Sequence, residues 1–320
     1  MKSLVTGGAG FIGSSLVEQL VKLGHKVIVL DNLSTGRLSS LNLVKKEIQF
    51  VNIDISDSNQ FLDNYFDEID WVFHLAGIAD IGASVTYPSN FFNTNVKGTL
   101  NVLEAAKKAK IKKFIYAASA SCYGTSDQYP TNEKTRINPK NPYATTKFLG
   151  EQLVIDWAKI YHMPNISLRF FNVYGLRSKS KKGYGAVFSI FLTQKLAKAP
   201  LTIIGDGYQT RDFVHVSDVV EAIMAAARRE DNGEIYNVGT GEEVTINKIA
   251  EIIGGNKIYV SKRTDEIERS VADISKIKKM LKWHPKISIE NGIQMLLQNI
   301  DDWINCPVYT PENTIEVTKN

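Results

Sequence analysis

Short apolar runs alternate with longer amphipathic stretches through the first half of the chain. In the longer stretches apolar residues recur every three to four positions, which predicts helices over residues 11–23, 59–66, 88–108 and 142–161. The runs expected as strands are Ser3–Thr6, Lys26–Leu30, Ile48–Ile53, Asp70–Leu75, Lys113–Ala118 and Ile166–Phe171. This alternation predicts an α/β fold, a doubly wound parallel sheet with helices on both faces and right-handed crossovers.

The pattern changes after about residue 172. Glycine-rich turns such as Gly205-Asp206-Gly207 appear, the strands become shorter and the helices become less regular. We therefore expect a larger sheet domain over residues 1–172 and a smaller α/β lobe over residues 173–305, from which some segments cross back to the first domain. Residues 306–320 contain two prolines and no helical period, so we expect an extended or disordered tail.

Composition narrows the class of protein. Hydrophobic residues make up 43% of the chain and charged residues 22%, which is ordinary for a soluble globular protein. No run approaches the ~18 apolar residues of a membrane helix, and a strand-like run begins at Leu4, so we expect a cytoplasmic protein without signal peptide or membrane contact. Two cysteines fit a reducing compartment. A net charge of +4 argues against nucleic acid as a partner, and the histidines lack metal-ligand spacing, so no metal is expected.

A glycine-rich segment, Thr6-Gly7-Gly8-Ala9-Gly10-Phe11-Ile12-Gly13, joins the first strand to the first helix. Glycines at this place permit a tight turn and let the backbone approach a pyrophosphate, whose charge meets the helix N-terminus. Asp31 follows the second strand, where a carboxylate accepts hydrogen bonds from adenosine ribose and repels a 2′-phosphate. Asp54, after the third strand, is a candidate for the adenine amino group. The pattern predicts a Rossmann-type domain that binds NAD rather than NADP.

Tyr143 and Lys147 are four residues apart and therefore lie on one face of the expected helix. A neighbouring ammonium and a positive nicotinamide favour the phenolate, so we expect a lowered tyrosine pKa and a base usable near neutral pH. Ser119 and Ser121 follow the fifth strand, at the edge where open parallel sheets bind ligands. Either hydroxyl is a candidate to hydrogen-bond the substrate oxygen. Cys122 is expected to be a packing residue.

Taken together, these segments resemble the extended short-chain dehydrogenase/reductases, which are mostly nucleotide-sugar enzymes. The resemblance covers about residues 1–300 and also includes 31–36, 74–77, 169–175, 205–216, 263–275 and 281–285. It implies a catalytic set of Ser119, Tyr143 and Lys147, with Ser121 as the alternative or an auxiliary. It implies NAD as the cofactor, held by Gly7, Gly10, Phe11, Ile12, Gly13, Asp31, Asn32, Ser34, Gly36, Asp54, Ile55, Leu75, Ala76, Asn95, Tyr143 and Lys147.

For the substrate, the resemblance implies a UDP-sugar bound by Ser84, Asn172, Val187, Arg211, Arg263, Glu266 and Ser270. Guanidinium forks suit a diphosphate, and Glu266 replaces the Asp that usually meets the nucleotide ribose. Ser270 corresponds to a pocket position near the sugar 2-substituent, where a small residue accompanies acceptance of N-acetylated sugars. The two long helices, residues 93–108 and 143–161, imply a homodimer with a four-helix interface.

The residues after Ser119 separate the reactions of the family. Dehydratases carry an Asp-Glu pair there and decarboxylating members keep a Glu, whereas this chain has Ala120-Ser121. The resemblance therefore implies C4 epimerisation of UDP-glucose and UDP-galactose, and of the N-acetylated pair, through a transient 4-keto sugar and bound NADH. Three alternatives stay open: another nucleotide-sugar epimerase, a reductase or dehydratase of the family, and a non-catalytic NAD-sensing protein.

Overall fold

The centre of the computed structural model, which describes residues 1–57, 62–178, 187–262 and 267–310, is a seven-stranded parallel sheet. The strand order is β11-β6-β5-β4-β1-β2-β3. The strands are β1 (Lys2–Thr6), β2 (Lys26–Asp31), β3 (Ile48–Asn52), β4 (Trp71–His74), β5 (Lys113–Ser119), β6 (Asn165–Phe170) and β11 (Glu234–Val238). The order reverses between β1 and β4, and ligands of such sheets bind beyond the carboxyl ends of the strands at that point.

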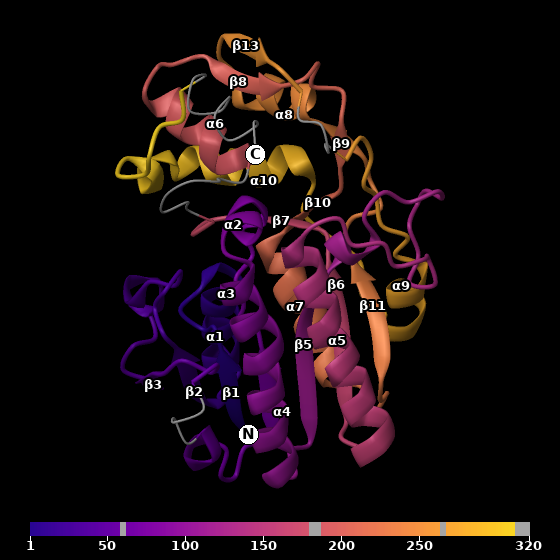
Figure 1. Cartoon of the computed structure of the whole chain (residues 1–320). Coiled ribbons are helices and arrows are strands. Elements are labelled where there is room, and N and C mark those ends of the chain that lie inside the picture. The colour runs from indigo at the N-terminus through magenta and orange to yellow at the C-terminus, as the bar shows by residue number, and fades with distance from the viewer. Residues whose placement is uncertain (58–61, 179–186, 263–266, 311–320) are drawn as a thin grey trace.

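Helices cover both faces of this sheet (Figure 1). The helices that pack on its strands are α1 (Phe11–Lys22), α4 (Thr99–Lys108), α5 (Pro142–Tyr161), α7 (Val216–Ala227) and α9 (Ser275–Leu281), and α3 (Pro88–Phe92) packs on α5. Neighbouring residues of one strand point to opposite faces, so Leu4 of β1 packs in one core with Leu103 of α4, and Val5 packs in the other with Leu16 of α1. Both faces are buried, as the apolar strands require. The expected α/β fold is confirmed.

All six expected strands form, each within one residue of the expected ends. The helix expected over residues 88–108 contains a π-helical turn, Asn93–Gly98, between α3 and α4. The helix expected over residues 59–66 is wrong in its described part, because Leu62–Tyr65 forms a single 3-10 turn. Glu68 then adopts φ 56°, which turns the chain toward β4. A longer helix therefore has no room between Leu62 and β4. Residues 59–61 lie outside the described residues.

The second lobe has its own core, built around Phe191, Ile203, Ile249, Leu296 and Trp303. Its remaining elements are α6 (Val187–Leu196), β8 (Leu201–Ile204), α8 (Ile246–Ile253), β13 (Lys257–Val260), α10 (Ile289–Gln298) and a 3-10 turn, Ile300–Trp303. Three two-stranded sheets lie here and at the junction, pairing β8 with β13, β7 (Asn172–Tyr174) with β10 (Phe213–His215), and β9 (Thr210–Arg211) with β12 (Val244–Thr245). Figure 1 shows this lobe above the carboxyl ends of the main sheet.

Parts of the chain beyond residue 172 belong to the main sheet. β11 pairs in parallel with β6 from Glu234 opposite Ile166 to Val238 opposite Phe170. α7 packs on α1, β5 and β6, and α9 packs on β11. The larger body is therefore assembled from three separate stretches of chain: the N-terminal part, α7 with β11, and α9. Within the described part of the chain, no helix has the length and apolar character needed to cross a membrane.

Candidate active site

The glycine loop adopts a conformation that side chains would obstruct. Gly7 has φ 69°, and a Cβ built there would lie 2.6 Å from the Ala76 backbone nitrogen. A Cβ at Gly13 would lie 2.1 Å from the Gly7 carbonyl oxygen. Gly10 is the N-cap of α1, and no side chain caps the helix start, so the first backbone N–H groups at Phe11 and Ile12 face outward. An uncapped helix N-terminus against bare backbone fits a diphosphate.

Asp31, at the end of β2, is buried against the glycine loop. Its carboxylate accepts hydrogen bonds from the backbone N–H groups of Ala9 at 2.9 Å and Leu33 at 2.8 Å. A Cβ at Gly36 would approach this carboxylate to 2.9 Å, so Gly36 lets the following loop close over it. The side chain of Asn32 accepts from the backbone of Ser34 at 3.0 Å. Asp31 therefore ties the glycine loop to the loop that follows β2.

Asp54 is held by protein groups. One carboxylate oxygen accepts from the Ser56 backbone and hydroxyl at 2.8 and 2.7 Å, and the other accepts from Asn32 at 2.9 Å. Burial raises the pKa of Asp54, but the hydrogen bonds outweigh it and the net direction is downward. Ile55 is buried, and its side chain packs where a Cβ at Gly98 would otherwise lie, 2.8 Å away. These residues form the floor between β3 and the π-helical turn.

A chain of hydrogen bonds joins the carboxyl ends of β1 and β4 to the π-helical turn. Thr99 donates its hydroxyl to the Asn95 carbonyl at 2.7 Å, so it must accept from His74 Nε2 at 2.9 Å. His74 Nδ1 then accepts from the Thr6 hydroxyl at 2.6 Å, and Thr6 accepts from the Ala76 backbone at 3.2 Å. Burial lowers the pKa of His74 to about 3, which keeps the ring neutral in this tautomer. The chain fixes the backbone of Leu75 and Ala76 beside the glycine loop.

The Asn95 side chain extends the same support toward α5. It accepts from the Ile78 backbone N–H at 2.9 Å and donates to the Ile78 carbonyl and the Thr146 hydroxyl, each at 3.1 Å. Asn95 is 1% exposed. Because π-helical turns inside α-helices concentrate at functional sites, the position of Asn95 within one agrees with a role near the ligand. The expected cofactor residues thus come together at one end of the sheet.

Tyr143, Ser119 and Ser121 form a row of hydroxyl groups. Tyr143 lies in the first turn of α5, which Asn141 caps through a 2.9 Å bond to the Ala144 backbone. The phenol donates to the Ser119 hydroxyl at 3.1 Å, and Ser119 shares a 2.8 Å hydrogen bond with Ser121. Contrary to the sequence expectation, the pKa of Tyr143 is raised, because burial outweighs the hydrogen bonds with Ser119 and Ser121. The protein groups around Tyr143 therefore favour the neutral phenol.

Lys147 lies one turn further along α5 and is buried. Its ammonium stands 4.4 Å from the centre of the Tyr116 ring and has no hydrogen-bond partner among the described residues. Burial lowers the pKa of Lys147 to about 8, against the opposing charge of Glu151. A buried ammonium without a hydrogen-bonding partner is costly, so it is suited to a polar ligand such as a ribose hydroxyl.

Three of the expected substrate residues lie on separate elements, α2, β7 and α6. Ser84, fully buried in α2 (Ile81–Thr86), donates its hydroxyl to the Ile81 carbonyl at 2.5 Å. Asn172 begins β7 with an exposed side chain, and Val187 begins α6. Ser84 therefore already has a partner for its hydroxyl proton, whereas Asn172 presents its amide outward. Arg263 and Glu266 lie outside the described residues.

Arg211 and Ser270 lie on neighbouring segments. The backbone N–H of Thr210 donates to the Glu268 carbonyl at 2.9 Å, and the Ala272 N–H donates to the Asp212 carboxylate at 3.1 Å. Two bonds therefore hold residues 210–212 beside residues 268–272. Asp212 is fully buried and also accepts from the Thr240 and Gly241 backbones and the Thr240 hydroxyl, at 2.6 to 2.9 Å. Asp212, which sequence reasoning had not singled out, therefore ties residues 240–241 and 272 to the strand that carries Arg211.

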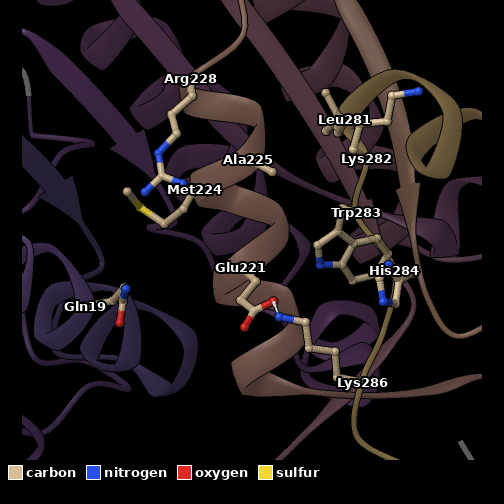
Figure 2. Close-up of a pocket in the computed structure, with 10 residues that line it drawn as sticks. All are labelled: Gln19, Glu221, Met224, Ala225, Arg228, Leu281, Lys282, Trp283, His284 and Lys286. Carbon is tan, nitrogen blue, oxygen red and sulfur yellow. Dashed lines mark ion pairs between the residues drawn. The ribbon is translucent and has the colours of Figure 1, made fainter.

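A separate pocket of about 400 Å³ lies between α1, α7 and the segment after α9 (Figure 2). Figure 2 shows Glu221 paired with Lys286 at one end and Trp283 on one wall, with Arg228 toward the other end. None of the expected site residues lines this pocket. In the described ranges, no group of three or more His, Cys, Asp or Glu side chains is arranged to hold a metal.

The fold and the side chains at this end of the sheet define a dinucleotide-binding α/β protein with a tyrosine–lysine–serine centre. Residues 3–239 match the sequence model of the NAD dependent epimerase/dehydratase family. The chain is 38% identical over 301 residues to a putative UDP-glucose 4-epimerase of Methanocaldococcus jannaschii, covering 92% of this chain and 96% of that one. The chain belongs to the NAD-dependent epimerase/dehydratase family.

Solved structures of related proteins agree with this placement. A UDP-glucose 4-epimerase from Thermotoga maritima, with UDP-glucose, superimposes with a TM-score of 0.89 at 34% identity, covering 94% of this chain and 99% of that one. A UDP-glucuronic acid 4-epimerase from Bacillus cereus, with UDP-glucuronic acid and NAD, gives a TM-score of 0.85 at 32% identity, with coverage of 94% and 99%. The cofactor of this family is NAD. The uncapped start of α1, the bare glycine loop and the Lys147 ammonium fit that cofactor.

Proposed function

We propose that the protein is a UDP-hexose 4-epimerase, which interconverts UDP-glucose and UDP-galactose. The observation that carries the proposal is the row of hydroxyl groups formed by Tyr143, Ser119 and Ser121. The two positions after Ser119 are Ala120 and Ser121, so neither carries a carboxylate. Hydroxyl groups can move a proton to and from one sugar oxygen. Removal of water from the sugar needs a further acid and base, which these positions do not supply.

Each residue of the centre has its own role in the proposed reaction. Tyr143 takes the proton from the sugar 4-hydroxyl and later returns it, and Ser119 donates a hydrogen bond to the same oxygen. Lys147 provides a positive charge that favours the phenolate against the burial of Tyr143. NAD⁺, when bound, supplies reversible oxidation at the sugar C4. Since the sugar leaves with no net change in oxidation state, the cofactor stays with the protein.

The binding groups follow from their places in the fold. Gly7, Gly10 and Gly13 with the start of α1 would hold the cofactor diphosphate, and Asp31 would hold the adenosine ribose. Arg211 and Asn172 would hold the diphosphate of the substrate, since the Asn172 backbone N–H donates to the carbonyl of Asp212, the residue after Arg211, at 3.0 Å. Of the expected diphosphate contacts, Arg211 and Asn172 are in the described part of the chain.

The proposed oligomer is a homodimer. Phe92, Leu100, Leu149 and Ile160 are exposed at 50, 37, 38 and 64% on α3, α4 and α5. These helices are adjacent on one face of the sheet (Figure 1). Two such faces placed together bury this apolar surface in a four-helix interface. Light scattering at micromolar concentration tests this, because a monomeric mass contradicts it, and Leu149→Lys should shift a dimer toward monomer.

The experiment for the activity is an NMR assay of the purified protein with UDP-glucose. We expect UDP-galactose to accumulate to equilibrium without added reductant. Tyr143→Phe should lower turnover by about 10²–10⁴-fold, as for loss of a general base, with NAD still bound. Tyr236→Phe is the matched control, because that buried phenol donates to Asp231 at 2.9 Å and is not part of the row formed by Tyr143, Ser119 and Ser121.

Other outcomes would replace the proposal. A 4-keto-6-deoxy product indicates a dehydratase, and stoichiometric use of NADH indicates a reductase. Inversion on another nucleotide sugar alone indicates a different epimerase. Tight NAD binding with no turnover of any nucleotide sugar indicates a non-catalytic protein. Near-normal turnover in Tyr143→Phe contradicts the mechanism even if UDP-galactose forms.

A further inference from the structure

A buried ion pair ties the catalytic helix to the sheet. Arg169 of β6 donates to both carboxylate oxygens of Glu151 in α5, from Nε at 2.9 Å and from Nη2 at 2.6 Å. The two side chains are 3 and 1% exposed. Glu151 lies four residues after Lys147 and eight after Tyr143, on the same helical face. The pair therefore fixes the rotation and height of the helix that carries Tyr143.

The same guanidinium holds a second element. Arg169 Nη1 donates to the hydroxyl of Tyr123 at 2.8 Å, and Tyr123 donates to the Asn237 side chain at 2.7 Å. Tyr123 ends the 3-10 turn Ala120–Tyr123, which directly follows Ser119. Asn237 in turn is bonded to the Thr131 carbonyl at 2.9 Å. The turn that carries the serines is thus attached to Arg169 from its far end.

The two elements that Arg169 holds, α5 and the 3-10 turn, also contact each other near the proposed reaction centre. In the β5–β6 register Arg169 stands opposite Ala118, the residue before Ser119. Tyr143 on α5 and Ser119 at the start of the turn touch across the 3.1 Å hydrogen bond. The Arg169 guanidinium is a rigid planar group with five N–H donors, and it bonds both α5 and the 3-10 turn. It therefore sets the distance between Tyr143 and Ser119. A buried network of this kind holds one arrangement, because each broken bond leaves an unsatisfied polar group.

We propose that Arg169 is a positioning residue for the reaction: through Glu151 and Tyr123 it holds the two halves of the Tyr143–Ser119 pair in register. This rests on the proposed function, which gives that pair its role. Arg169 does not touch the reacting atoms, so its effect should fall on kcat and leave binding of UDP-glucose and NAD nearly unchanged. Truncating one partner of a buried ion pair is strongly destabilising, so the informative changes are small ones.

The first test compares Tyr123→Phe, Arg169→Lys and the control Tyr236→Phe. Tyr123→Phe removes one hydroxyl and should lower kcat about five- to tenfold, in line with the loss of one hydrogen bond. Arg169→Lys keeps the charge but loses the fork, and should lower kcat about 100-fold, as for a misplacement near 1 Å. KM for UDP-glucose and the NAD content should stay within about twofold of wild type for all three variants, and Tyr236→Phe should keep its kcat. Unchanged kcat in Tyr123→Phe, or a rise of KM that accounts for the loss, overturns the proposal.

A second readout does not depend on the substrate. The ionisation of Tyr143 is followed by tyrosinate absorbance in the NAD-loaded protein, as the difference between each protein and its Tyr143→Phe counterpart. The Ser119 hydrogen bond lowers the pKa of Tyr143, so misplacing Ser119 should move the midpoint upward in Tyr123→Phe and not in Tyr236→Phe. If wild type epimerises no UDP-sugar but the midpoint moves, the proposed function fails and the positioning role stands. If wild type is active and the midpoint does not move, the positioning role fails alone.

Discussion

The Tyr143 hydroxyl donates to Ser119 at 3.1 Å, and Ser119 shares a hydrogen bond of 2.8 Å with Ser121. Ser119 therefore accepts directly from the base, and we expect it to contribute more than Ser121. We expect Ser119→Ala to lower kcat by about 10²–10³-fold, the usual cost of one donor to a developing oxyanion, and Ser121→Ala by about tenfold. Steady-state assays with UDP-glucose decide this. Equal losses in the two variants, or a larger loss in Ser121→Ala, would give the role to Ser121.

The activity should fall in alkaline solution because Lys147 loses its proton. Burial lowers the pKa of this lysine to about 8, so the ammonium is present below that pH and disappears above it. Lys147→Arg keeps its charge throughout this range and should move the alkaline limb of the kcat profile upward, at a lower plateau. A profile with the same alkaline midpoint in both proteins would show that another group controls it.

Acid should destabilise the fold through buried histidine. The pKa values of His74 and His215 are about 3 and 4 because both rings are buried, whereas unfolded histidine titrates near 6.5. Between pH 6.5 and about 4 the unfolded chain therefore binds protons that the folded chain does not. The free energy of unfolding should fall by up to about 1.4 kcal/mol per pH unit for each histidine as pH decreases through this window.

Urea unfolding at several pH values measures this slope. His74→Gln should flatten it by up to one proton while lowering stability at neutral pH, since the Thr6 and Thr99 bonds change. An unchanged slope in His74→Gln would mean that this ring titrates alike in both states.

Substrate breadth should depend on Ser270. This residue is half-buried in the segment held beside Arg211, and a serine there leaves space that a tyrosine would fill. We expect turnover of both UDP-glucose and UDP-N-acetylglucosamine. Ser270→Tyr should abolish the second activity and spare the first, whereas Ser270→Ala should retain both. The prediction fails if wild type does not turn over the N-acetylated sugar, or if the ratio of the two activities is the same in Ser270→Tyr.

Cofactor choice should depend on Asp31. Its carboxylate is fixed by the Ala9 and Leu33 N–H groups, so a 2′-phosphate would meet a negative charge that cannot move away. Calorimetry on protein stripped of cofactor should show NAD bound at least about 100-fold more tightly than NADP, the effect of ~3 kcal/mol of repulsion and lost hydrogen bonding. Asp31→Asn should reduce this preference. Equal affinities in wild type would remove the role given to Asp31.

The sequence by itself determined the parts that depend on neighbouring residues. Apolar periodicity placed six strands to within one residue, and the glycine spacing placed the tight turn before α1. The four-residue separation put Tyr143 and Lys147 on one helical face. Each of these follows from backbone geometry over a few residues, which local sequence controls.

Only the tertiary structure decided which distant residues meet. Glu234–Val238 reads as an ordinary short strand, and its place as the seventh strand depends on the open edge of β6. Arg169, Glu151, Tyr123 and Asn237 are separated by up to 114 residues and share no periodicity, so no local pattern links them. The raised pKa of Tyr143 has the same origin. It results from burial by everything packed around the phenol, whereas the sequence showed only that Lys147 lies one turn away.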